Sequence, residues 1–129
     1  MGMTATLCLA AAIYHEARGE PEPGQFAVAE TIMRRVEDSR WPDDVCEVVY
    51  QPHQFEWTAD HQPVTEPVAW RKAEQIAEIV LDRPTTASTC ADHFAHIDME
   101  PDWAQWMIVD IEIGGHVFYC ANVDDWRKK

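Results

Sequence analysis

Basic residues are scarce in this sequence of 129 residues: ten Lys and Arg stand against 23 Asp and Glu, which gives a formal net charge of −13. Basic residues stand side by side only at Arg34-Arg35, Arg71-Lys72 and the terminal Arg127-Lys128-Lys129, and none of these runs exceeds three residues. Proteins that bind nucleic acid or anionic membrane surfaces rely on clusters of basic residues, which neutralise phosphates and release counterions. We therefore expect no nucleic acid and no membrane among the partners of this protein.

Long hydrophobic runs are missing as well. No segment reaches the roughly 20 apolar residues that a membrane-spanning helix requires. The apolar stretch 5–13 has no basic residue before it and no clear cleavage site after it, so we expect no signal peptide. Hydrophobic residues still make up 47% of the chain. That share is enough to build a core, and the length fits one domain.

Signature motifs of several kinds of chemistry are also absent. There is no CxxC pair and no GxSxG, and the HExxH pattern that would start at His15 fails because position 19 is Gly. We therefore expect no bound metal, no cofactor, and no Ser or Cys nucleophile. The cysteines are Cys8, Cys46, Cys90 and Cys120. They allow three arrangements of two disulfides, but we favour ordinary buried thiols, which are common in protein cores.

The hydrophobic pattern predicts a mainly helical α+β fold. Segments 4–18, 24–38 and 66–82 carry apolar residues at helical spacing, and Pro42 followed by two Asp predicts a short helix over about 42–50. Residues 51–65 show no period and are expected to form an ordered loop. Near the end, 107–113 alternates as a strand does, Gly114-Gly115 predicts a two-residue turn, and 116–120 returns as a second strand. His116 falls on the apolar side of this hairpin, which favours a buried structural histidine.

Two glutamates flank the end of the first predicted helix. Glu16 lies in its last turn, where the partial negative charge of unpaired carbonyl groups, together with any apolar packing, raises the pKa of a carboxyl group. A carboxylic acid that stays protonated near neutral pH is what glycoside cleavage needs as its general acid. Arg18 would counter the effect if it paired with Glu16, and Glu20 lies beyond Gly19. From spacing alone, both glutamates are more typical of surface charges at a helix end.

Amide and aromatic side chains gather in two irregular segments. Such groups are typical of sugar-binding sites, where amides bind hydroxyl and N-acetyl groups and flat rings cover the apolar face of the sugar. The first segment contains Tyr50, Gln54, Phe55 and Trp57, and the second contains His93, Phe94 and Trp103.

Several motifs, taken together and in order, resemble the SleB/CwlJ-type cell-wall hydrolase family. They are Ile13-Tyr14-His15-Glu16-Ala17-Arg18-Gly19-Glu20, Tyr50-Gln51-x-x-Gln54-Phe55-x-Trp57, Ala91-x-His93-Phe94, Pro101-x-Trp103 and Ile113-Gly114-x-His116-x-Phe118-Tyr119. The matches extend from about residue 9 to residue 120. Two departures from the family pattern are Arg34, where relatives often carry Asn, and Ala95, where they often carry an aromatic residue or His.

The resemblance implies a lysozyme-like fold in which residues 1–129 form one catalytic domain. It implies cleavage of peptidoglycan glycan strands between N-acetylmuramic acid and N-acetylglucosamine, chiefly as a lytic transglycosylase. Separately, we expect the protein to be a monomer. Glu16 would be the catalytic acid. The substrate-binding residues would be Glu20, Tyr50, Gln54, Phe55, Trp57, His93, Phe94 and Trp103.

The enzyme would act on the cell wall, in the periplasm or outside the cell, and release as a phage endolysin would fit the lack of a signal peptide. Two alternatives stay open. The first is an N-acetylmuramoyl-L-alanine amidase whose metal would be bound by His93, His96 or His116. The second is a murein-binding protein without activity.

Overall fold

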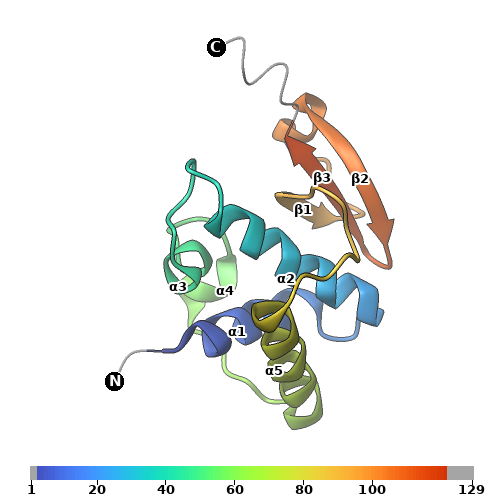
Figure 1. Cartoon of the computed structure of the whole chain (residues 1–129). Helices are drawn as coiled ribbons and strands as arrows, with labels where there is room; N and C mark the ends of the chain where they lie inside the picture. Colours follow the sequence, from blue (N-terminus) through green and yellow to red (C-terminus); the bar gives the residue numbers. More distant parts are fainter. Residues whose placement is uncertain (1–2, 122–129) are drawn as a thin grey trace.

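Figure 1 shows the computed structural model of the chain, which describes residues 3–121; the basic tail at 127–129 lies outside that range. In chain order the elements are α1 (Ala5–Ala17), α2 (Glu22–Val36), α3 (Val45–Val49), α4 (Glu56–Asp60), α5 (Pro67–Asp82), β1 (His93–His96), the 3₁₀ helix η1 (Asp102–Trp106), β2 (Met107–Ile113) and β3 (His116–Ala121). The α-helices gather into one layer and the small sheet lies beside α2 (Figure 1). The predicted α+β, mainly helical class is confirmed.

Helix α1 is the centre of the helical layer, where it contacts α2, α3 and α5. It begins where the Thr4 side chain accepts a hydrogen bond from the Leu7 N–H at 3.1 Å, which satisfies a backbone donor of the first turn. Its middle is buried on every side and rich in alanine, so neighbouring helices approach closely. It ends just before Gly19, whose φ of +83° is the left-handed conformation expected of a glycine after a helix.

The other helices differ in detail from the prediction. Helix α2 begins at Glu22, two residues early, because Pro23 fits the first turn of a helix. Helix α3 begins only at Val45, because the Asp44 side chain caps it by accepting from the Glu47 N–H. The prediction of a loop over 51–65 is wrong in part, because α4 forms within that segment. Helix α5 follows the prediction. No helix among residues 3–121 is both long and apolar enough to cross a membrane.

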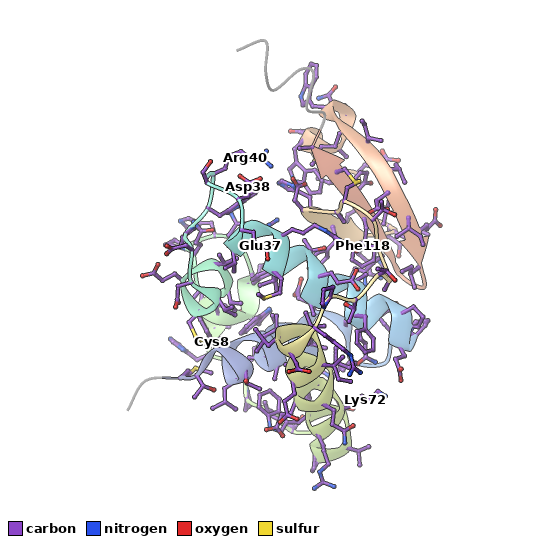
Figure 2. All side chains as sticks on the ribbon, viewed as in Figure 1. Cys8, Glu37, Asp38, Arg40, Lys72 and Phe118 are labelled. Atoms are coloured by element: carbon purple, nitrogen blue, oxygen red, sulfur yellow. A yellow bond between two sulfur atoms is a disulfide. The ribbon has the colours of Figure 1, made fainter. Side chains whose placement is uncertain are left out.

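The sheet has one strand more than the sequence predicts. Strand β3 lies at its centre, paired antiparallel with β2 through the predicted turn and with β1 on its other side. Alternate residues of β3 are buried, and among them Phe118 lies between the sheet and α2 (Figure 2). His116 is 6% exposed, so its predicted burial is confirmed. Strand β1 has only four residues and no clear alternation, which is why its pattern gives no strand signal.

Polar contacts from α2 fix the segment that leads into β1. The buried Glu30 carboxylate accepts hydrogen bonds from the side chain of Thr85 and from the backbone and side chain of Ser88. Arg34 donates to the Ser88 hydroxyl at 2.8 Å and to the Ala91 carbonyl at 3.0 Å. Arg34, one of the two departures from the family pattern, therefore contacts the segment that leads into β1 and does not lie free on the helix surface.

The cysteine prediction is wrong, because the four cysteines form two disulfides. Cys8–Cys46 joins α1 to α3, and Cys90–Cys120 joins the segment before β1 to β3. Each bond links residues that are distant in the sequence and meet only after the helices and strands have packed. Spacing along the chain therefore gives no sign of either pair.

Removing the first disulfide tests its contribution to stability. Replacing Cys8 and Cys46 together by Ala should lower the free energy of unfolding by about 3 kcal/mol, because a bond across 38 residues restricts the unfolded chain. Urea unfolding followed by circular dichroism measures the difference. Dithiothreitol should destabilise the wild type and leave a variant without any of the four cysteines unchanged. Equal urea midpoints for wild type and double variant would contradict this role.

Candidate active site

Glu16 lies in the last turn of α1 and faces a pocket of about 330 Å³. The chain segment around the start of α4 forms the opposite wall, with Gln54, Phe55, Glu56 and Trp57. Gln54 and Phe55 belong to the loop that leads into α4, and Glu56 and Trp57 lie in its first turn. An acidic group, an amide and aromatic rings share one pocket, as the sequence predicts.

Burial raises the pKa of the Glu16 carboxyl group to about 7, and the negative charge of Glu56 adds to this effect. An interaction with the indole N–H of Trp57 acts in the opposite direction and is weaker than burial. That N–H is itself buried and makes no hydrogen bond of standard geometry within residues 3–121. The direction of the predicted shift is confirmed, and burial, one of its two expected causes, makes the largest contribution.

Arg18 does not neutralise Glu16. Its guanidinium pairs with Glu66 at 2.6 Å and lies over the ring of Tyr14. The Tyr14 hydroxyl in turn accepts hydrogen bonds from the backbone N–H groups of Thr65 and Glu66. These contacts attach the end of α1 to the start of α5 and leave the raised pKa of Glu16 in place.

Trp57 organises the aromatic wall of the pocket. It is 7% exposed, stacks on His15 with ring centroids 4.5 Å apart, and packs against Phe55 at 6.0 Å and edge-on against Tyr50 at 5.7 Å. Phe55 continues the series to Phe94, at 6.2 Å on β1. The structure thus brings together Tyr50, Phe55, Trp57 and Phe94.

Glu20, which the resemblance assigns to substrate binding, contacts the turn between β2 and β3. Its Oε1 accepts a hydrogen bond from the Gly115 N–H at 2.7 Å, which ties the turn between β2 and β3 to the helical layer. Gly114 has a φ of +55° and packs against Glu20 and Pro21, so the turn needs glycine both for conformation and for space. Glu20 is not among the residues that line the Glu16 pocket.

His93 and Trp103 form a second aromatic group with Trp41 and Tyr119. The His93 ring lies 5.0 Å from Trp103 and 5.8 Å from Trp41, and Trp103 lies edge-on to Tyr119 at 5.3 Å. The Asp92 carboxylate holds His93 through Nδ1 at 2.9 Å and also binds Arg40, which lies with Asp38 on the loop after α2 (Figure 2). Apart from Glu20, the predicted sugar-binding residues therefore divide into two groups, one at Glu16 and one around His93.

Sequence reasoning assigned no site role to five residues of the pocket and the second aromatic group: His15, Trp41, Glu56, Gln62 and Tyr119. Glu56 lies two positions after Gln54, in the motif already singled out, so adjacency to that motif was an available signal. Tyr119 stands in one of the motifs that carry the family resemblance, whereas nothing local in the sequence distinguishes Trp41 from an ordinary core aromatic residue.

The histidines named for a metal-dependent amidase are not gathered. His93 binds Asp92, whereas His96 and His116 lie edge-on with their ring centroids 6.1 Å apart. Within residues 3–121, the one cluster of three close ligand atoms is Cys90, Asp110 and Cys120. Its two sulfurs are bonded to each other, and Asp110 accepts hydrogen bonds from three successive backbone N–H groups. This cluster does not fit a metal ion.

A helical layer beside a small antiparallel sheet, with a buried acid at the end of its first helix, defines a lysozyme-like protein. The chain belongs to the Cell Wall Hydrolase family, whose model matches residues 19–119. The match begins three residues after Glu16 and includes both aromatic groups. The resemblance seen in the sequence motifs is confirmed.

Curated relatives and solved structures agree with this family. The chain is 42% identical over 74 residues to a spore cortex-lytic enzyme of Oceanobacillus iheyensis, covering 57% of this chain and 25% of the relative. It is 30% identical over 113 residues to one of Bacillus cereus, covering 85% and 42%. The chain thus spans a quarter to less than half of the length of these relatives.

Two solved structures share the fold. The catalytic domain of the germination-specific lytic transglycosylase SleB from Bacillus anthracis has a TM-score of 0.74 and 28% identity over 92% of this chain and 96% of that one. The catalytic domain of SleB from Bacillus cereus has a TM-score of 0.70, with 28% identity over 92% of each chain. The lysozyme-like fold is therefore confirmed.

The raised pKa of Glu16 predicts a pH-dependent cost in stability. The folded protein binds the proton of Glu16 more tightly than the unfolded chain does, so stability falls as pH rises from about 4.5 through about 7. Glu16→Gln removes this loss. The variant should be more stable than wild type at pH 8, by about 1 to 3 kcal/mol, and nearly equal to it at pH 4.

Chemical denaturation at the two pH values measures this difference. Glu78→Gln, an exposed position on α5, is the matched control and should show the same small effect at both pH values. A Glu16→Gln variant whose advantage does not grow with pH would show that Glu16 titrates normally.

Proposed function

We propose that this protein cleaves the glycan strands of peptidoglycan between N-acetylmuramic acid and N-acetylglucosamine, as a lytic transglycosylase that acts as a monomer with Glu16 as its general acid and base. The observation that carries the proposal is the Glu16 carboxyl group, with a pKa raised to about 7, in a pocket lined by an amide and aromatic rings. The names of the relatives, a spore cortex-lytic enzyme and a lytic transglycosylase, support the same reaction class.

The reaction needs one carboxyl group in two successive roles. Protonated Glu16 donates its proton to the glycosidic oxygen as the bond to C1 of the muramic acid residue breaks. The resulting carboxylate then takes the proton of the C6 hydroxyl of that sugar, and the C6 oxygen bonds to C1 to close a 1,6-anhydro ring. No water is consumed, and Glu16 ends protonated as it began. A pKa near 7 suits both roles, because neither protonation state is strongly disfavoured at neutral pH.

The aromatic groups would bind successive sugars of the strand. Tyr50, Phe55, Trp57 and Phe94 form a continuous wall from the pocket to β1, and flat rings of this kind suit the apolar faces of sugars. His93 and Trp103, held beside Trp41, would contact a sugar further from the cleaved bond. Glu20 would act indirectly, by keeping the turn of the sheet against the helical layer.

Two disulfides support action outside the cytoplasm. Disulfides form and persist in oxidising surroundings such as the periplasm or the cell exterior, where peptidoglycan is also found. We therefore propose that the protein works at the cell wall.

Digestion of purified murein tests the reaction. The wild type should release products that end in 1,6-anhydromuramic acid, seen by mass spectrometry, and Glu16→Gln should reduce the rate by at least about a hundredfold. Products heavier by one water would show hydrolysis, and free stem peptides would show an amidase. Glu78→Gln should digest murein at the wild-type rate. An equally active Glu16→Gln variant would remove Glu16 from its proposed role.

The pH profile gives a separate test. Because the protonated form of Glu16 starts the reaction, kcat/KM should be constant at lower pH and fall about tenfold per unit above pH 7. Glu56→Gln removes a negative charge that raises the pKa of Glu16, so its profile should begin to fall at lower pH than that of the wild type. An unchanged profile in this variant would contradict the electrostatic coupling of the two glutamates.

A further inference from the structure

A buried arginine connects the Glu16 pocket to the sheet. Arg35 on α2 is 5% exposed, and its guanidinium lies 5.1 Å from the ring centroid of Trp41. Its Nε donates to the backbone carbonyl of Asp92 at 2.7 Å, and its Nη1 donates to Oε1 of Gln54 at 2.9 Å. Arg35 is thus held by Trp41 and by the backbone of Asp92, and it in turn holds the side chain of Gln54.

This contact determines the orientation of the Gln54 amide, that is, which of its oxygen and NH₂ group faces Arg35. A guanidinium has only donors, so it must be the amide oxygen, and not the NH₂ group, that faces Arg35. The NH₂ group therefore points away from Arg35, and within residues 3–121 it donates to no protein group. Gln54 is exposed and lines the pocket that contains Glu16. The contact with Arg35 therefore orients the NH₂ group of Gln54 as a hydrogen-bond donor at this pocket.

We propose that Arg35 fixes Gln54 as an obligate donor to the acetamido carbonyl oxygen of a bound sugar, which makes Gln54 a specificity-determining residue and Arg35 its positioning residue. The inference rests on the proposed function for its substrate. An amide carbonyl is the strongest neutral acceptor on these sugars, since their other oxygens belong to hydroxyl and ether groups. Phe55 and Trp57 line the same pocket and offer apolar surface for the acetamido methyl group.

Arg35 has the properties that such a positioning residue needs. Burial lowers its pKa to about 10, so the guanidinium stays charged at neutral pH and keeps donating. A hydrogen bond from a charged donor is stronger than one between neutral groups, which favours a single orientation of the amide. A lysine at this position would offer one nitrogen in place of a planar fork and could not hold both partners in the same geometry.

Binding of neutral oligosaccharides tests the proposal without requiring cleavage. Isothermal titration calorimetry in the Glu16→Gln background compares the β-1,4-linked tetrasaccharide of N-acetylglucosamine with that of glucose, which lacks the acetamido group. The parent should prefer the acetylated sugar by about tenfold or more. Gln54→Glu keeps an acceptor for Arg35 but loses the NH₂ donor, so its preference should fall to about threefold or less.

Two further variants make the result specific. Gln62→Glu places the same charge on the same pocket without touching the amide that Arg35 holds, and should retain the preference. Arg35→Lys should reduce the preference although Gln54 is intact, an effect that a purely structural arginine would not produce. Thermal unfolding shows which variants are folded. If Arg35→Lys is not folded, the comparison of Gln54→Glu with the parent still tests the proposal.

The outcomes separate this inference from the proposed function. A parent protein without preference, or a Gln54→Glu variant that keeps it, would overturn the role of Gln54. If the preference behaves as expected while wild type leaves murein uncut, the amide contact stands and the proposed reaction fails.

Discussion

The enclosure of α1 by α2, α3 and α5 is the constraint on which the site depends. A surface helix would present a glutamate in its last turn to water, and its carboxyl group would titrate normally. Here the middle of the helix, residues 8–14, is buried on every side, and its last turn lies against the wall formed by Phe55 and Trp57. The same packing that builds the core therefore also removes water from Glu16. Small residues in the middle of α1 allow this, because they let three helices approach one another.

The second constraint is polar and joins the helical layer to the sheet. Glu30, Arg34 and Arg35 project from one side of α2 and bind the segment 85–92 through its side chains and backbone. Glu20 makes a similar contact at the far end, on the turn between β2 and β3. Buried charges with several partners specify one arrangement of two layers better than apolar packing does, because any shift leaves a donor or acceptor unsatisfied. These contacts fix the position of the aromatic group around His93 relative to the Glu16 pocket.

Local signals in the sequence were sufficient to predict part of the fold and of the candidate site, but not all of either. The helix that carries Glu16, the glycine that ends it and the hairpin at Gly114 depend on neighbouring residues, and all were predicted. Strand β1 exists because β3 supplies its hydrogen-bond partners, and the disulfides exist because distant elements pack, so neither has a local pattern. The direction of the pKa shift of Glu16 was predicted, but its largest cause is burial, and the extent of that burial depends on residues about 40 positions away and has no local pattern. The amide orientation of Gln54 depends on Arg35, 19 residues earlier, and the sequence shows no sign of it.

Stability and chemistry oppose each other at Glu16, and the two disulfides bear on that opposition. A carboxyl group whose pKa is raised to about 7 lowers the stability of the folded protein at neutral pH, at most by about 3 kcal/mol. Each disulfide closes a loop of 30 or 38 residues and contributes about the same amount in the opposite direction. Cys8–Cys46 lies on α1 itself, so one of these bonds holds the helix that carries the destabilising group. A small domain can thus keep a poorly solvated acid in place without enlarging its core.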